Sequence, residues 1–279
     1  MLQRAIVAFT VGPVLLLAAY LGGWFYFIPL LLLLLVAGVE YAHIMRALKH
    51  NTPLWLLLPA IVALLAAAWW PYAWGPQWNL GGLALFISLF AALIYALWLF
   101  ERGDTLDAAL DWFALVGGIM LLGWVGSHFF LLRSLPENGW RWTTVAFMSI
   151  WTADMAAFLV GKYLTGRWPL GRHALAPRLS PKKTVEGYVA GVIAGPVFAT
   201  LTALVLDLPL VLAGLAGLAV GVLGLFGDLS ISLLKREAGV KDSGRLFPGH
   251  GGALDRLDSL IWAVAIVYYL VVYLGPLFT

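Results

Sequence analysis

The sequence predicts an all-α polytopic membrane protein, a bundle of about nine transmembrane helices with a cytoplasmic N-terminus. Two observations carry this prediction. Of the 279 residues, 62% are hydrophobic and only 11% are charged, against about 25% charged residues in ordinary soluble domains. The apolar residues also form long continuous runs, whereas a membrane β-barrel shows alternating segments of about ten residues. Soluble globular enzymes and disordered proteins are therefore excluded.

The apolar runs and their breaks give the nine helices. Residues 5–39 form a single run, which at about 1.5 Å per residue is too long for one crossing of about 30 Å. Gly22 and Gly23 near its middle predict a break. Residues 187–227 are again double in length, and the break is predicted at Asp207-Leu208-Pro209. The other predicted helices are 54–70, 83–100, 112–132, 143–161 and 259–275.

The basic residues support this count. With nine spans, 15 of the 17 Lys and Arg residues fall on the cytoplasmic side, and only Arg133 and Arg141 fall outside. This distribution agrees with the positive-inside rule. Tryptophans gather in the predicted outer segments and indicate an interfacial aromatic belt, with a ligand cage as the alternative. A cleaved signal peptide is the alternative interpretation of the first 20 residues.

Chemistry is concentrated in the carboxy-terminal half. We expect residues 1–142 to form a helical scaffold with lipid or dimer contacts, and residues 143–279 to form the catalytic region of the same membrane domain. Two predicted cytoplasmic segments, 162–186 and 228–258, hold 17 of the 31 charged residues. Ordinary solvated loops are the alternative, but acids at membrane depth are costly and usually functional. With no cysteine in the chain, thiolate sites are excluded.

The segment 228–258 has the composition of a metal and phosphate site. If the preceding helix continues past Asp228, then Asp228, Ser232 and Lys235 share one face. The sequence Pro248-Gly249-His250-Gly251-Gly252 cannot form a regular helix, and its backbone N–H groups can cradle phosphate oxygens. His250 is a candidate general base or phosphate donor, or a residue that structures the loop.

Two acids follow this loop. Asp255 and Asp258 are expected to open the last helix on neighbouring positions of one face, although acids at a helix start are also good capping groups. Oxygen ligands without cysteine favour Mg²⁺, which is commonly held by one or two carboxylates plus substrate phosphates. Asp228 and Asp255 are the candidate pair.

The upstream segment adds positive charge and one more acid. Ser180 and Pro181 predict a helix start, where Lys182 and Lys183 would make a phosphate site or only fix the topology. Asp154 lies in an otherwise apolar helix and needs a partner. That partner is a lysine, a metal ion or a group on another helix that forms a hydrogen bond with Asp154.

These motifs together resemble a known family. Ser232-x-x-Lys235-Arg236, Lys241-Asp242, Pro248-Gly249-His250-Gly251-Gly252 and Asp255-Arg256-x-Asp258 are similar to the carboxy-terminal motif of phosphatidate cytidylyltransferase, or CDP-diacylglycerol synthase. Ser180-Pro181-Lys182-Lys183-Thr184-x-Glu186-Gly187 resembles a second motif of that family. The resemblance covers about residues 150–275. Ala253 is smaller than the expected residue, and the segment after Asp154 lacks the expected glycine-containing sequence.

The resemblance implies the reaction of CTP with phosphatidate to give CDP-diacylglycerol and pyrophosphate, at the inner (cytoplasmic) membrane of the cell. It also implies Mg²⁺ and a second cation, for which K⁺ is a candidate. Asp228 and Asp255, with Asp154 as a further candidate, would hold metal. Lys235, Ser232, Asp258 and His250 are the catalytic candidates. The binding candidates are Ser180, Lys182, Lys183, Arg236, Lys241, Gly249, Gly251, Gly252 and Arg256. CTP, phosphatidate and bilayer lipids are the expected partners, with a homodimer as an option and no nucleic acid.

Three other functions agree less well with the sequence. An ion-coupled transporter would use Asp154 and Asp228 as an ion path, but the sequence shows no inverted repeat. The acid-rich motif of CDP-alcohol phosphotransferases is absent from the sequence. A structural scaffold leaves the clustered acids, lysines and glycines unexplained.

Overall fold

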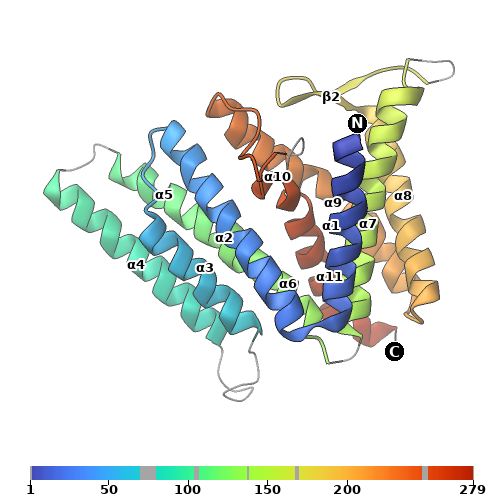
Figure 1. Ribbon diagram of the computed structural model, residues 1–279, viewed down its shortest axis with the longest axis horizontal. Coiled ribbons are helices and arrows are strands. Elements are labelled where there is room, and N and C mark those ends of the chain that lie inside the picture. The colour runs from blue at the N-terminus through green and yellow to red at the C-terminus, as the bar shows by residue number, and fades with distance from the viewer. Residues whose placement is uncertain are drawn as a thin grey trace. The chain divides into compact units, whose positions relative to one another are not determined.

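The fold is known from a computed structural model, which describes residues 2–69, 80–103, 107–136, 138–166, 170–246 and 251–278 (Figure 1). Side chains are described from residue 12 onward. The chain divides into two compact units. Unit 1 comprises residues 1–131 and 234–257, and unit 2 comprises residues 132–233 and 258–279. The predicted division of roles at residue 142 stays a prediction.

The predicted helices are present, and several of them extend beyond the expected ends. In chain order they are α1 (Leu2–Leu21), α2 (Gly23–Ala47), α3 (Leu54–Trp69), α4 (Leu80–Arg102), α5 (Ala108–Gly118), the π-helix η1 (Ile119–Val125), α6 (Gly126–Arg133), α7 (Gly139–Leu159), the π-helix η2 (Val160–Leu164), α8 (Val185–Val205), α9 (Leu210–Glu237), α10 (Leu254–Leu257), α11 (Leu260–Leu274) and the 3₁₀ turn η3 (Gly275–Leu277).

Both predicted breaks in the long runs are confirmed. Gly22 and Gly23 have φ of 66° and 51°, a left-handed conformation that glycine adopts without steric cost, and they separate α1 from α2. Asp207 has φ of 54° between α8 and α9. Pro209 lacks an N–H and immediately precedes α9, so it cannot continue α8.

Among the described residues, seven helical segments are long and apolar enough to cross a membrane, so the chain is an integral membrane protein. They are Gly23–Ala47, Leu80–Arg102, Ala108–Arg133, Gly139–Leu164, Val185–Val205, Leu210–Glu237 and Leu254–Leu277. The apolar helices Gly12–Leu21 and Leu54–Trp69 are shorter. The count of nine spans and the cytoplasmic N-terminus therefore stay predictions.

Small residues let the helices of each unit approach closely. In unit 1, α3 packs between α2 and α4, and Gly38 of α2 leaves room for the Ile61 side chain of α3. In unit 2, α7 packs along α8 (Figure 1). An added Cβ at Gly195 of α8 would lie 2.6 Å from the Gly217 carbonyl oxygen of α9. Such close backbone contacts are typical of membrane helix packing.

A short antiparallel hairpin interrupts the helices of unit 2. Strand β1 (Ala174–Ala176) pairs with β2 (Ser180–Thr184), and Ala176 lies opposite Ser180. Neither strand was predicted. The expected helix start at Ser180 is wrong: α8 begins at Val185, and the Thr184 side chain accepts a hydrogen bond from the Gly187 N–H.

The later helix start has a physical reason. A helix that began after Ser180 would place Lys182 and Lys183 in its first turn, where the positive end of the helix dipole disfavours cations. Thr184 is also a favourable cap type and lies directly before the apolar run. The lysines are therefore carried by a strand, which has only a small net dipole.

Candidate active site

The predicted site residues that the structure describes lie in two clusters, one in each unit, and each cluster is built around an aspartate. Asp228 and Asp258 belong to unit 2, as does Asp154. Asp255 and Lys235 belong to unit 1. The proposed sharing of one cation by Asp228 and Asp255 stays a prediction.

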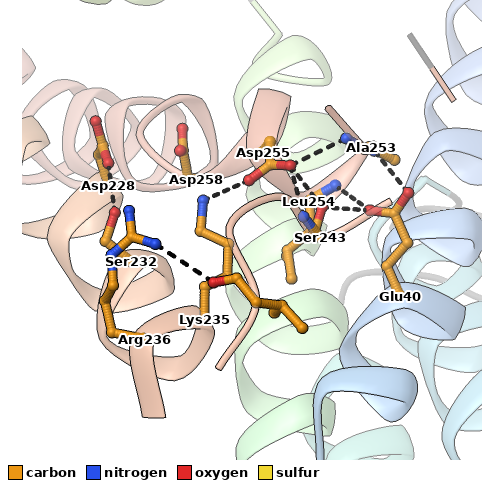
Figure 2. Close-up of polar contacts among 12 residues, drawn as sticks. Glu40, Asp228, Ser232, Lys235, Arg236, Ser243, Ala253, Leu254, Asp255 and Asp258 are labelled. Carbon is orange, nitrogen blue, oxygen red and sulfur yellow. Dashed lines mark hydrogen bonds and ion pairs between the residues drawn. The ribbon is translucent and has the colours of Figure 1, made fainter. Parts of the chain in front are cut away.

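In unit 2, Asp228 is held by a lysine and a hydroxyl. Helix α9 continues past Asp228 as expected, so Ser232 lies one turn later and its Oγ donates to Asp228 Oδ1 at 3.2 Å (Figure 2). Lys183 reaches across from β2, and its Nζ lies 2.6 Å from Asp228 Oδ2. The Asp228 side chain is still 33% exposed. This carboxylate is thus oriented on both oxygens while it stays accessible to a ligand.

The hairpin that carries Lys183 is fixed to the start of α8. His173 lies just before β1, and its Nδ1 is 2.6 Å from Glu186 Oε1. The His173 backbone N–H also donates to the Glu186 carboxylate, and the Val185 N–H donates to the His173 carbonyl. Lys182 is exposed on β2. Glu186 therefore fixes the beginning of the hairpin whose second strand presents the two lysines.

Two other predicted acids of unit 2 flank the Asp228 region. The Ser259 hydroxyl donates to Asp154 Oδ2 at 3.2 Å, which is the hydrogen bond between helical segments that was one of the alternatives for Asp154. An added Cβ at Gly227, next to Asp228, would lie 2.5 Å from the Asp258 carbonyl oxygen. Unit 2 thus brings Asp258 close to Asp228. A metal-binding role for Asp154 stays a prediction.

The sequence predicts that Asp255 and Asp258 begin one helix, but in the structure this segment forms two helices separated by a turn. Asp255 lies in the short helix α10, whereas Asp258 lies in the turn before α11. Asp258 Oδ1 accepts the N–H of Ser259 at 2.7 Å. Aspartates that bind a neighbouring backbone N–H in this way compete with helical hydrogen bonds, so the two acids do not share one helix.

In unit 1, every oxygen of the Asp255 carboxylate has a partner. Lys235 Nζ lies 2.5 Å from Oδ1, and both side chains are nearly buried (Figure 2). Oδ2 accepts three hydrogen bonds, from the Ser243 N–H at 2.8 Å, the Ser243 hydroxyl at 3.0 Å and the Gly252 N–H at 3.0 Å. The three donors on Oδ2 leave Oδ1 as the oxygen best placed to bind a cation.

The end of α9 and the glycine pair shape the segment around Asp255. The Val240 N–H donates to the Lys235 carbonyl and the Gly239 N–H to the Arg236 carbonyl, a Schellman motif with Gly239 at φ of 70°. Gly251 has φ of 82°. The Gly252 N–H, expected to bind phosphate, has Asp255 as its acceptor in this structure.

The remaining predicted residues are less constrained. Arg236, Lys241 and Arg256 are exposed, and Ser180 is half-buried in β2. Gly249 and His250 lie outside the described residues, so their expected roles stay predictions.

Sequence reasoning missed Glu40, which lies on α2. This residue is 6% exposed, and its carboxylate accepts hydrogen bonds from the Ala253 and Leu254 N–H groups at 3.0 and 2.9 Å. The Ser243 hydroxyl donates to it at 2.7 Å. The signal was present: an acid inside an apolar helix is costly and usually functional, which is the rule that singled out Asp154.

The donor set fits a divalent cation that also uses substrate oxygens. Asp228 and Asp255 each hold a lysine ammonium within 2.6 Å, so each position already stabilises positive charge. Within the described residues, no three His, Asp or Glu side chains are grouped as a metal cage. Mg²⁺ usually takes one or two carboxylates and completes its coordination with phosphates and water, and its binding by Asp228 and Asp255 stays a prediction.

The chain is similar to known proteins over most of its length. A model of the cytidylyltransferase family matches residues 2–274. A Synechocystis protein named phosphatidate cytidylyltransferase is 35% identical over 92% of this chain and 91% of its own length. A Bacillus subtilis protein of the same name is 34% identical over 76% of this chain and 78% of its own length. These matches extend the resemblance through the helices before residue 150, and the chain belongs to the cytidylyltransferase family.

Proposed function

We propose that this protein transfers the cytidylyl group of CTP to phosphatidate and so makes CDP-diacylglycerol and pyrophosphate. One observation carries the proposal: in a membrane protein of the cytidylyltransferase family, Asp228 and Asp255 each lie within 2.6 Å of a lysine ammonium. Such clusters of hard oxygen ligands and cations suit a reaction between two anionic phosphates.

The reaction requires charge neutralisation more than proton transfer. An oxygen of the lipid phosphate attacks the α-phosphorus of CTP, a new P–O bond forms, and the bond from the α-phosphorus to the bridging oxygen of the β-phosphate breaks. The attacking phosphate is already anionic, so no activated serine or cysteine is needed. Catalysis then depends on positioning and on stabilising charge at the α-phosphorus and on pyrophosphate.

Each cluster has a part in this mechanism. Asp228 and Asp255 would hold Mg²⁺, with Asp258 in support. When bound, the metal would neutralise phosphate charge and polarise the α-phosphate. Lys183 and Lys235 would turn from their aspartates toward the phosphates as these bind.

Further groups would complete the binding of both substrates. The triphosphate and the lipid head would meet the exposed cations of Lys182 and Arg236. Ser232 would donate a hydrogen bond beside Asp228. His250, if it reaches the phosphates, would donate rather than act as a base.

The setting of the reaction is part of the same proposal. The helices would hold the acyl chains of phosphatidate in the inner membrane, and CTP would arrive from the cytoplasm. K⁺ as a second cation and a homodimer belong to the proposal as well.

The test is a detergent-micelle assay with purified protein, phosphatidate and CTP labelled at the α-phosphate, with and without Mg²⁺. The expected result is a lipid-soluble labelled product that requires both phosphatidate and Mg²⁺, with one pyrophosphate released per product. Absence of that product with folded protein would overturn the proposal. An ion-coupled transporter would instead move ions across vesicle membranes without consuming CTP.

A further inference from the structure

We infer that Glu40 is a positioning residue for Asp255: its buried carboxylate fastens the segment between α9 and α10 and so fixes the geometry of the Asp255 carboxylate. This inference rests on the proposed function, because it assigns Glu40 to the reaction through Asp255. It adds a residue of the amino-terminal half to a site otherwise built from the carboxy-terminal half.

The contacts of Glu40 all lead to the segment that surrounds Asp255. Its oxygens accept the first N–H groups of the α10 region, from Ala253 and Leu254. The same carboxylate accepts the Ser243 hydroxyl, 203 residues away in the sequence. Figure 2 shows Glu40 reaching from α2 toward Ser243, Ala253 and Leu254. These three donors supply both oxygens of the buried carboxylate with hydrogen bonds.

Ser243 connects Glu40 to Asp255 directly. Its hydroxyl lies 2.7 Å from Glu40 Oε2 and 3.0 Å from Asp255 Oδ2. Since a serine hydroxyl has one proton, it can serve both carboxylates only as a shared donor. Its backbone N–H also donates to Asp255 Oδ2. A shift of Glu40 is therefore transmitted to Asp255 through one residue.

Glycines at two positions allow this close approach. A Cβ added at Gly244 or at Gly252 would collide with the Glu40 carboxylate. The carboxylate cannot simply turn away, because three hydrogen bonds hold it in a buried position. Gly252 of the motif, together with Gly244, thus allows the contact with Glu40.

A Glu40→Gln variant tests the inference without a large change of shape. A glutamine amide must place its NH₂ group against either the Ala253 N–H or the Leu254 N–H, so at least one donor loses its acceptor. The segment then opens more often. We expect trypsin to cleave after Lys241 or Arg245, which are exposed in this segment, about tenfold faster than in the wild type.

The matched control is Asp111→Asn. Asp111 is an equally buried carboxylate of unit 1 that accepts a backbone N–H at 2.8 Å from Asn51, a donor that lies outside this segment. The Asp111→Asn variant should have a lower Tm than the wild type, but trypsin should not cleave it faster after Lys241 or Arg245. Equal cleavage in both variants, or unchanged cleavage in Glu40→Gln, would overturn the inference.

A kinetic measurement separates positioning from general weakening. Glu40→Gln should lower kcat and raise the Mg²⁺ concentration needed for half-maximal activity, while the KM for phosphatidate stays within about twofold. If Glu40→Gln does not fold, Ser243→Ala serves instead, because it removes only the hydroxyl between the two carboxylates, and it should raise the Mg²⁺ requirement in the same way. A normal Mg²⁺ requirement in the folded variant would contradict the inference. Inactive wild-type protein would overturn the proposed function. Trypsin cleavage does not depend on activity, so it would still test the contact of Glu40 with this segment.

Discussion

Lys235 and Asp255 form an ion pair at 2.5 Å in which the lysine side chain is 10% exposed and the aspartate side chain 7%. The second lysine–aspartate pair, Lys183 with Asp228, is similar in length but more exposed, at 26% for the lysine side chain and 33% for the aspartate side chain. The two pairs therefore have the same chemistry and different surroundings, and this difference leads to the first prediction.

Loss of one lysine should cost much more stability in the buried pair. Lys235→Met leaves the Asp255 charge buried without its counterion, which costs about 3–5 kcal/mol. Lys183→Met, at a partly exposed pair, should cost about 1 kcal/mol or less. Thermal unfolding of both variants in one detergent compares them. Equal decreases of Tm in the two variants would show that burial does not determine how much each ion pair contributes to stability.

Asp228→Asn should remove activity and leave the fold intact. The carboxylate is a third exposed, so its loss does not bury an unpaired charge, but the amide no longer attracts a cation. Turnover of CTP and phosphatidate should fall at least about a hundredfold, while Tm changes by only a few degrees. Activity near the wild-type level would refute the metal assignment.

Gly252→Ala should destabilise the segment before α10. The added methyl group would meet the buried Glu40 carboxylate, and overpacking of this kind typically costs about 1–3 kcal/mol. Gly275→Ala is the control, because its nearest neighbours would be 4.0 Å from the new Cβ. Denaturant titration of the two variants measures the difference, and an unaffected Gly252→Ala would argue against the tight contact.

The start of α8 can be tested by a pair of hydroxyl deletions. Thr184→Ala removes the acceptor of the Gly187 N–H and should cost about 1 kcal/mol, as helix caps do. Ser180→Ala, which lies within β2, should change the free energy of unfolding by much less. The opposite order would place the cap at Ser180, as the sequence alone suggested.

The helices could be predicted from the sequence because hydrophobic runs and backbone breaks are local signals. Gly22 with Gly23 and Asp207 with Pro209 could be identified as breaks from residue type alone. The start of α8 could not, because Ser180 and Thr184 are both good caps and only the pairing of β2 with β1 decides between them. A strand of three residues paired with one that contains proline has no periodicity to detect.

The candidate site was predicted unevenly for a related reason. Asp228 and Asp255 both lie in the polar segment 228–258, which stands out from the apolar sequence around it. Glu40 stands alone at the end of a long apolar run, and its donors lie more than 200 residues later. Nothing local specifies such a contact, although an isolated acid in a membrane helix is itself a reason to search for donors.

The long separation of Glu40 from its donors also constrains how the protein is made. Ala253 follows Glu40 by 213 residues, and at roughly 5–20 residues per second a ribosome needs on the order of 10–40 s to add them. During that interval α2 is already synthesised while its acid has none of these three donors. The nascent chain must therefore keep this acid hydrated or bound by other groups until synthesis is almost complete, and unit 1 can close only then.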